Sequence, residues 1–180
     1  MANNLLITGE PGCGKTTLLL KAIAPYLELE VAGGVYTEEM TLGRERVGFK
    51  LKVIGGGMTT LAHNLMYSFS HKLGQYYVSS QAVSFVAVPA ILQALQREKV
   101  QLVVIDEVAR MQLVSDSFLP AVDEALYSAK PVIATVHARA HELTDNIKLR
   151  DDVKLVIVTP ETREECLAEV LDWLGHHVPL

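Results

Sequence analysis

Short apolar runs alternate along the chain with longer stretches in which apolar residues recur every three or four positions. The runs lack regular polar alternation, which is typical of parallel strands that are buried on both faces. We predict such strands at residues 5–8, 102–105, 131–135 and 153–158. Helices between successive strands predict right-handed crossovers and a mainly parallel, three-layer α/β sandwich.

The stretches between the runs predict amphipathic helices. The first begins at Lys15 and is expected to end near Ala24, because Pro25 lacks the backbone N–H that a helix interior requires. A second begins near Pro89 and ends before the charged Arg97. Further helices are predicted at residues 117–128 and from Thr159 and Pro160 onward.

One part of the chain departs from this alternation. Residues 33–37 and 47–51 are strand-like and flank a polar turn around Gly43, which predicts a β-hairpin inserted into the parallel pattern. Residues 59–84 show no clear periodicity, and only residues 76–78 are suggestive of a short strand.

Composition and charge narrow the class of protein. At 180 residues the chain suits a single domain, which we expect to span residues 1–180. The net charge of −5 disfavours nonspecific attraction to nucleic acid or to an anionic membrane, and no apolar run is long enough to cross a bilayer. The two cysteines cannot form a disulfide framework, and the N-terminus lacks the basic start of a signal peptide, so we expect a cytoplasmic protein.

A glycine-rich segment matches the phosphate-loop pattern G-x-x-x-x-G-K-[ST] at every specified position. It follows the first predicted strand and precedes the first predicted helix, which is the context that this pattern requires. Glycines allow backbone N–H groups to wrap the α- and β-phosphates, and the helix N-terminus adds partial positive charge. We expect a nucleotide to contact Gly9, Glu10, Pro11, Gly12, Cys13, Gly14, Lys15, Thr16 and Thr17.

Within this loop, each specified polar side chain has an expected role. Lys15 can reach the β- and γ-phosphate oxygens, and the Thr16 hydroxyl is placed to ligate Mg²⁺. Cys13 could be a reactive thiol at a helix N-terminus, but we favour a small side chain that fills an unspecified loop position.

An acidic pair follows the apolar run at residues 102–105. Asp106, at the carboxyl end of a strand neighbouring the loop, is expected to hold Mg²⁺ and so to contribute to nucleotide binding. Glu107 can orient and activate an attacking water. A hydrolase needs such a base, whereas a kinase must exclude water, so the pair favours hydrolysis.

Further segments extend these two motifs over nearly the whole chain: residues 35–39 and 43–49, residues 106–113 with Ser115 and Phe118, residues 131–137, and Arg163. In this order they resemble the small nucleoside-triphosphatase family known from thermophiles, whose animal member is called cancer-related nucleoside-triphosphatase. The resemblance implies a RecA-like P-loop core. It also implies slow, Mg²⁺-dependent hydrolysis of ATP, GTP and other nucleoside triphosphates to diphosphates and phosphate.

The chain departs from the family pattern after the acidic pair. Ala109 replaces a usual glycine, Arg110 a lysine and Gln112 a glutamate, and Tyr77 stands where the family tends to have glycine. The Ala109 methyl is expected to hinder close approach of its backbone N–H to a γ-phosphate. These differences bear on turnover rate more than on nucleotide binding.

Arginines and strand-end polar residues are further candidates. An arginine often neutralises charge on the transferring phosphoryl group. Arg110 is the preferred catalytic candidate, because it follows the acidic pair, and Arg163 is second. The other arginine candidates are Arg44 and Arg46 on the hairpin.

The predicted strand at residues 131–135 is expected to lie beside the acidic strand. Thr135 there could sense the γ-phosphate or satisfy local backbone groups. His137 and His141 lack a helix start and a third ligand, so we predict no metal site for them.

Three functions share such a phosphate loop. A nucleoside-triphosphatase is favoured, and the alternatives are a nucleotide or nucleic-acid kinase and a switch ATPase that needs a partner. The hairpin could serve a kinase as a lid. A GTPase is disfavoured, because the chain contains no Asn-Lys-x-Asp motif and Ala109 replaces the glycine of Asp-x-x-Gly. The absence of a base-reading motif agrees with broad nucleotide specificity, and no motif selects an oligomeric state.

Overall fold

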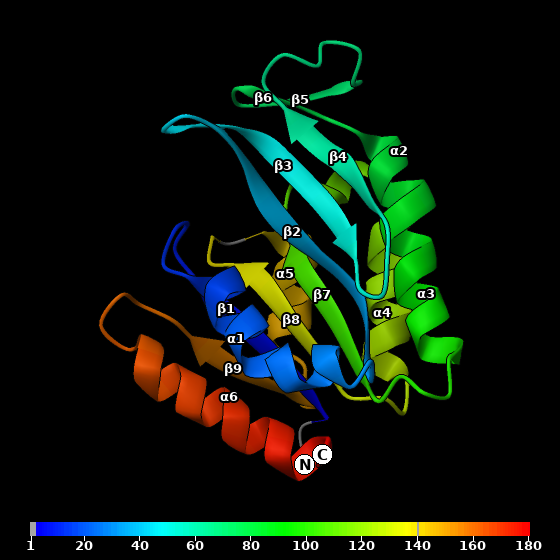
Figure 1. The fold of residues 1–180 in the computed structure, drawn as a ribbon, viewed down its shortest axis with the longest axis vertical. Helices are drawn as coiled ribbons and strands as arrows, with labels where there is room; N and C mark the ends of the chain where they lie inside the picture. Colours follow the sequence, from blue (N-terminus) through cyan, green and yellow to red (C-terminus); the bar gives the residue numbers. More distant parts are fainter. Residues whose placement is uncertain (1–2, 140) are drawn as a thin grey trace.

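Nine strands form one sheet within residues 3–139 and 141–180, which the computed structural model describes (Figure 1). The strand order is β5-β6-β4-β3-β2-β7-β8-β1-β9. The strands are β1 (Asn4–Gly9), β2 (Ala32–Leu42), β3 (Glu45–Val53), β4 (Met58–His63), β5 (His71–Leu73), β6 (Tyr76–Val78), β7 (Leu102–Val108), β8 (Val132–His137) and β9 (Val153–Ile157).

The parallel part of the sheet consists of β2, β7, β8, β1 and β9, and the remaining strands continue it in antiparallel pairs. The helical elements are α1 (Lys15–Glu28), α2 (Ser80–Ala82), the π-helix η1 (Val83–Ala87), α3 (Val88–Gln96), the 3-10 helix η2 (Gln112–Val114), α4 (Phe118–Tyr127), α5 (Glu142–Lys148) and α6 (Arg163–His177). The predicted mainly parallel α/β architecture is confirmed.

Helices cover both faces of the sheet, which makes three layers (Figure 1). Alternation along β1 illustrates the division: Leu5 and Ile7 pack with α1 and α6, whereas Leu6 packs with α3, α4 and α5. All three side chains are buried, which explains why β1 appears in the sequence as an unbroken apolar run.

The predicted hairpin is confirmed: β2 and β3 pair antiparallel, and both strands are part of the main sheet. Residues Ala32 to Val35 of β2 pair in parallel with β7, and the rest of β2 pairs antiparallel with β3. Gly34 allows this close packing, because its φ is 117° and a Cβ there would lie 2.1 Å from the carbonyl oxygen of Val104.

The prediction that the first helix ends near Ala24 is wrong, since α1 continues through Pro25 to Glu28. Pro25 is exposed, whereas the next residue, Tyr26, is buried and donates a hydrogen bond of 2.9 Å to the carbonyl of Val178. Packing against the C-terminal residues therefore outweighs the backbone hydrogen bond that proline cannot make.

Two other helix boundaries differ from the prediction. The helical run before Pro89 begins already at Ser80, where the Ser79 hydroxyl caps it by accepting from the N–H of Ala82 at 3.1 Å. The last helix begins at Arg163, because Thr159 and Thr162 form a hydrogen-bonded turn before it.

Among the described residues, none of the helices is long and apolar enough to cross a membrane.

Candidate functional site

The predicted site residues meet at the carboxyl edge of the parallel strands. The phosphate loop joins β1 to α1, and the acidic pair lies near the end of β7. The two strands are not direct neighbours, because β8 lies between them. Ligands of open parallel sheets bind at this edge, where strand ends and helix N-termini converge.

Backbone geometry at two glycines shapes the phosphate loop. Gly9 has a φ of 154°, and a Cβ there would lie 2.3 Å from the carbonyl oxygen of Val158. Gly14 is left-handed, with a φ of 102°, and precedes α1, whose N-terminus has no side-chain cap. The first N–H groups of α1 are therefore available to a phosphate.

Lys15 lies folded against the loop that carries it. Its Nζ donates to the carbonyl of Gly9 at 3.0 Å and to that of Glu10 at 3.4 Å. The same Nζ lies 3.8 Å from Oε1 of Glu107. A lysine held by carbonyls and one carboxylate can exchange these partners for phosphate oxygens.

The Cys13 side chain is buried in the apolar cluster beneath α1 and α6. This environment fits the packing interpretation of Cys13 rather than a reactive thiol. Arg163 reaches the same residue from α6, because its Nε donates to the Cys13 carbonyl at 2.6 Å. The Arg163 side chain therefore braces the outer side of the loop.

Asp106 is fully buried at the centre of a hydroxyl-rich cluster. Its Oδ1 accepts from the hydroxyl of Thr16 at 2.9 Å and from that of Thr135 at 2.5 Å. Its Oδ2 accepts from both the N–H and the hydroxyl of Thr37, each at 3.1 Å. Four donors thus compensate the burial of this carboxylate.

The sequence singled out Thr135 as a candidate site residue but gave Thr37 no role. Thr135 is fully buried and points its hydroxyl at Asp106, so it serves the carboxylate directly. The role of Thr37 was missed. Its signals were its place in the family-like segment 35–39 and at the end of the glycine and valine run of β2, and the pairing of β2 with β7 brings it to Asp106.

The donor set at this point suits a hard divalent cation. Thr16 and Asp106 present hydroxyl and carboxylate oxygens side by side, and no cluster of three or more His, Cys, Asp or Glu side chains that could hold a metal occurs among the described residues. Mg²⁺ commonly binds through one or two protein oxygens and completes its shell with water and substrate phosphates. Thr16 and Asp106 fit that pattern.

Glu107 is half-buried beside Lys15. Desolvation by burial raises the pKa of its carboxyl above the ordinary value; the Lys15 charge opposes this shift and the Asp106 charge adds to it. A carboxylate with a raised pKa is a better proton acceptor than a solvated one, which suits a general base.

The backbone that carries Glu107 is held by a residue that the sequence did not single out for this role. Gln112 is buried, and when its amide is assigned with the nitrogen facing the nearby acceptors, this nitrogen donates to the carbonyls of Glu107 and Ala109, each at 3.2 Å. The Gln112 backbone N–H also donates to Ala109 at 3.0 Å. The family glutamate at this position could not donate in its ionised form, so the glutamine makes a different clamp.

The candidate arginines occupy different places. Arg110 is exposed and lines the same cleft as Lys15 and Glu107. Arg46 also lines that cleft, and it forms an ion pair of 2.6 Å with Glu39. Arg44 lies at the exposed turn between β2 and β3. Only Arg110 combines a place in the cleft with a position directly after the acidic pair.

The structure gives the positions of His137 and His141. His137 ends β8 and lines the cleft, with the ring of His141 6.0 Å away. Burial lowers the pKa of His137 below its ordinary value, with smaller contributions from nearby cations. The two histidines do not share a helix, because His137 ends β8 and α5 begins only after His141.

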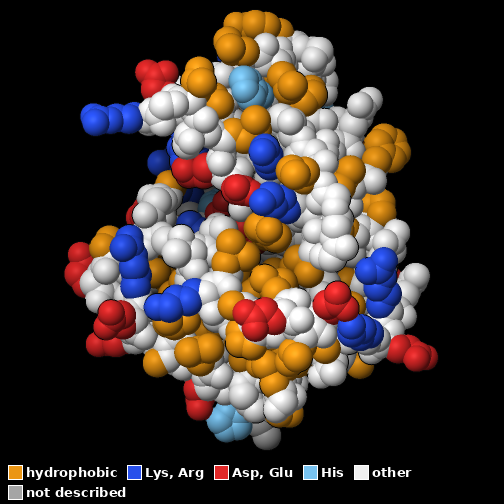
Figure 2. All heavy atoms as spheres, viewed as in Figure 1, with side chains coloured by type: hydrophobic (Ala, Val, Ile, Leu, Met, Phe, Trp, Pro, Cys, Tyr) orange, Lys and Arg blue, Asp and Glu red, His pale blue; other side chains and the backbone are white. Residues whose placement is uncertain are grey.

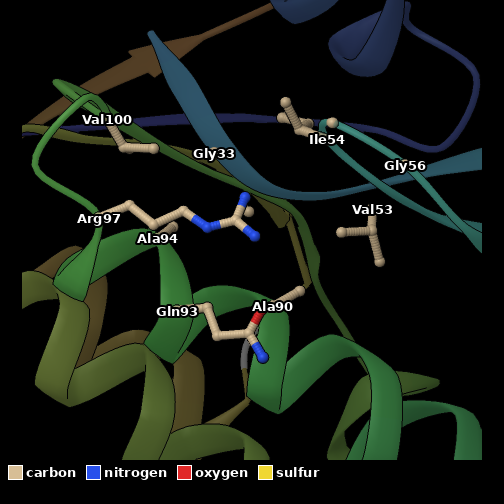
Figure 3. A pocket seen from close by; sticks show the side chains of 11 residues that line it. Gly33, Val53, Ile54, Gly56, Ala90, Gln93, Ala94, Arg97 and Val100 are labelled. Atoms are coloured by element: carbon tan, nitrogen blue, oxygen red, sulfur yellow. The ribbon is translucent and has the colours of Figure 1, made fainter. Parts of the chain in front are cut away.

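Two cavities differ in volume and in the residues that line them. The larger, of about 1050 Å³, contains Lys15, Thr16 and Glu107 and extends along β2 and β3. Figure 2 shows the surface hollowed beside the hairpin, with basic and acidic side chains around the opening. The smaller, of about 140 Å³, is shown in Figure 3; Arg97 is the only charged residue among those that line it. The larger cleft is the candidate active site.

Comparisons with known proteins agree with this site. A family model described as NTPase matches residues 4–171. The nucleoside-triphosphatase THEP1 of Thermotoga maritima is 36% identical over 170 residues, which cover 94% of each chain. THEP1 of Thermofilum pendens is 40% identical over 166 residues, which cover 91% of this chain and 90% of the relative.

Two solved structures share the fold. The crystal structure of THEP1 from the hyperthermophile Aquifex aeolicus superposes with a TM-score of 0.80 at 29% identity, covering 95% of this chain and 98% of that one. The solution structure of a human cancer-related nucleoside triphosphatase gives 0.79 at 29% identity, with coverage of 96% and 97%.

Proposed function

The chain belongs to the NTPase family and is a nucleoside-triphosphatase; we propose that it uses Mg²⁺ to hydrolyse ATP, GTP and other nucleoside triphosphates to diphosphates and phosphate. Broad specificity is supported by the lack of an Asn-Lys-x-Asp motif in the sequence. Substitution of Ala109 for the family glycine supports slow turnover.

One observation carries the proposal. Side chains about 90 positions apart in the sequence meet at one edge of the sheet: Thr16 contacts Asp106 at 2.9 Å, and Lys15 lies 3.8 Å from Glu107. Lys15, Thr16 and Glu107, proposed to bind phosphate, to bind the metal and to accept a proton, all line one cleft, which supports the proposal. These are the parts that hydrolysis of a triphosphate requires.

The residues around the phosphates have distinct roles in this proposal. Backbone N–H groups of the loop bind the α- and β-phosphates, with contacts from the loop residues and Thr17. Lys15 leaves the carbonyls of Gly9 and Glu10 and pairs with the β- and γ-phosphate oxygens. Thr16 and Asp106 are the residues that would hold Mg²⁺, which would neutralise charge on the β- and γ-phosphates.

Glu107 acts on the attacking water. Its carboxylate accepts the water proton while the water oxygen bonds to the γ-phosphorus and the bond from that phosphorus to the bridging oxygen breaks. The Gln112 amide fixes the main chain of Glu107 and so orients this carboxylate. Arg110 is proposed to neutralise charge on the transferring phosphoryl group from the rim of the cleft.

The test is phosphate release from a panel of nucleoside triphosphates with and without Mg²⁺, on wild type, Lys15→Ala and Glu107→Gln. We expect release that needs Mg²⁺ but no acceptor molecule, and that both substitutions abolish. Nucleotide binding is expected to survive in Glu107→Gln and to weaken in Lys15→Ala. Release that depends on an added acceptor would favour a kinase, and release only after a partner protein is added would favour a switch.

A further inference from the structure

One short polar contact joins the phosphate loop to the last helix. Arg163 is the first residue of α6, and its Nε donates to the carbonyl of Cys13 at 2.6 Å. Hydrogen bonds from an ionised donor are roughly twice as strong as those between neutral groups. The two residues are 150 positions apart in the sequence, so the contact exists only because the fold brings the start of α6 to the loop.

This contact fixes the direction of the peptide unit that joins Cys13 to Gly14. The unit is planar and trans, so its C=O and its N–H point in opposite directions. Gly14 lines the cleft, whereas Cys13 and Arg163 are not among the described residues that line it. Because Arg163 holds the Cys13 carbonyl on the outer side, the Gly14 N–H is turned toward the cleft. This N–H has no hydrogen-bond partner among the described residues, so it is free to donate to a phosphate.

The residue at position 14 does not by itself keep this direction. Rotation of the peptide unit would reverse the sign of φ at Gly14, which is 102°. Glycine adopts either sign of φ at similar cost, so the backbone of Gly14 permits both orientations. The Cys13 side chain is anchored in the apolar cluster, but that anchor does not hold its carbonyl. In the rotated form a carbonyl oxygen, rather than an N–H donor, would face the phosphate.

The Arg163 side chain lies directly over the peptide unit that it holds. A Cβ built on Gly14 would lie 3.1 Å from Nε of Arg163 and 3.6 Å from its Cζ. The turn before α6 sets the position of Arg163, because the N–H groups of Thr159 and Thr162 each donate to the hydroxyl of the other, at 3.1 and 3.3 Å. The segment between β9 and α6 therefore supports the loop from outside.

From this geometry we propose that Arg163 is a positioning residue, which keeps the Gly14 N–H turned toward the phosphates of the bound nucleotide. Arg163 acts through the Cys13 carbonyl and contacts neither the substrate nor the metal. Without Arg163, the free protein divides between two orientations of the peptide unit, of which one binds phosphate. The apparent affinity then falls in proportion to the competent fraction, whereas the bound complex and its chemistry are unchanged. The proposal rests on the proposed function for the place of the phosphates in the loop.

The experiment is calorimetric titration of ADP with Mg²⁺ into full-length wild type and Arg163→Met, with ATP hydrolysis measured on the same samples. Methionine keeps an unbranched side chain over Gly14 but cannot donate a hydrogen bond. If the competent fraction falls to about one tenth, Kd for ADP and KM for ATP should each rise about tenfold, while kcat stays within about twofold. Arg163→Lys should recover part of the affinity, because its Nζ can donate to the same carbonyl.

A direct measurement of the peptide orientation accompanies the titration. In amide NMR spectra of the nucleotide-free protein, the Gly14 N–H should give one sharp resonance in wild type. In Arg163→Met the same resonance should shift or broaden, because the peptide unit exchanges between two orientations.

Lys154→Met is the matched control. It removes the same charge and breaks the ion pair of 3.0 Å between Lys154 and Glu169 of α6, which does not involve the loop. The control should bind ADP as tightly as wild type, and thermal melts should show that both variants are folded.

The proposal is overturned if Arg163→Met binds ADP as tightly as wild type, or if Lys154→Met weakens binding equally. A lower kcat with unchanged Kd would also overturn it and would place Arg163 on the transferring phosphoryl group instead. Wild type that binds ADP but hydrolyses no triphosphate would refute the proposed function alone. Wild type that binds no ADP would refute both.

Discussion

Thr135→Val tests how the protein stabilises a buried carboxylate. Thr135 is fully buried, and its hydroxyl lies 2.5 Å from Oδ1 of Asp106, at the short end of hydrogen bonds to ionised oxygen. Valine has nearly the same shape but cannot donate. Because hydrogen bonds to charged groups contribute about 1.5–3 kcal/mol, we expect the free energy of unfolding to fall by about 2–3 kcal/mol.

A second threonine supplies the matched control for this substitution. Thr8, in the neighbouring strand β1, is also buried, but its hydroxyl has no hydrogen-bond partner among the described residues. Thr8→Val should therefore be neutral or slightly stabilising, because it removes an uncompensated buried hydroxyl. The two variants differ in partner rather than in size, burial or secondary structure.

The assay is urea unfolding at neutral pH, followed by circular dichroism, together with thermal melts. A loss of about 2–3 kcal/mol should lower Tm by about 4–12 °C in a chain of this length. In an Asp106→Ala background the cost of Thr135→Val should nearly vanish, because the acceptor is gone. Equal costs for Thr8→Val and Thr135→Val, or an unchanged cost without Asp106, would refute the assignment of the effect to this hydrogen bond.

Three further predictions concern catalysis and pH. Arg110→Ala should lower kcat at least about tenfold with little change in nucleotide Kd, and unchanged turnover in steady-state assays would contradict its role. Ala109→Gly should raise kcat about threefold, because it removes a methyl group from the cleft. A lower kcat in a variant of equal stability would contradict the idea that this methyl group hinders turnover. Arg150 lowers the pKa of Asp152. In urea unfolding near pH 7, wild type should therefore be more stable than Asp152→Asn by at most about 1 kcal/mol. This difference in unfolding free energy should disappear as the pH falls below about 4, where the Asp152 carboxylate becomes protonated. A difference that stays constant with pH would contradict the assigned role of the Asp152 charge.

The strongest predictions came from segments whose structure is set locally. The strand, glycine turn and helix around Lys15 follow one another in the sequence, so residue pattern and backbone requirements were sufficient to place them. The apolar run before Asp106 was equally legible, because a strand buried on both faces is apolar throughout. The roles of Lys15 and Glu107 remain proposals, although the fold brings them together.

Predictions failed where a distant contact decided the outcome. The end of α1 depends on Tyr26 reaching Val178, and no local pattern near Pro25 reveals that contact. Thr37 belongs to the site only because β2 pairs with β7 at one of its ends and with β3 at the other. Gln112 clamps Glu107 through a turn that periodicity does not describe.

The sequence by itself determined the strand, glycine-rich loop and helix around residues 9–16, because such a loop is built from consecutive backbone groups and a few fixed side chains. The tertiary structure alone decided how Asp106 is compensated and where the cleft extends. Those features depend on the tertiary arrangement, which brings Thr16 of helix α1, Thr37 of β2 and Thr135 of β8 to one carboxylate. Interactions between residues far apart in the chain leave no fixed spacing in the sequence.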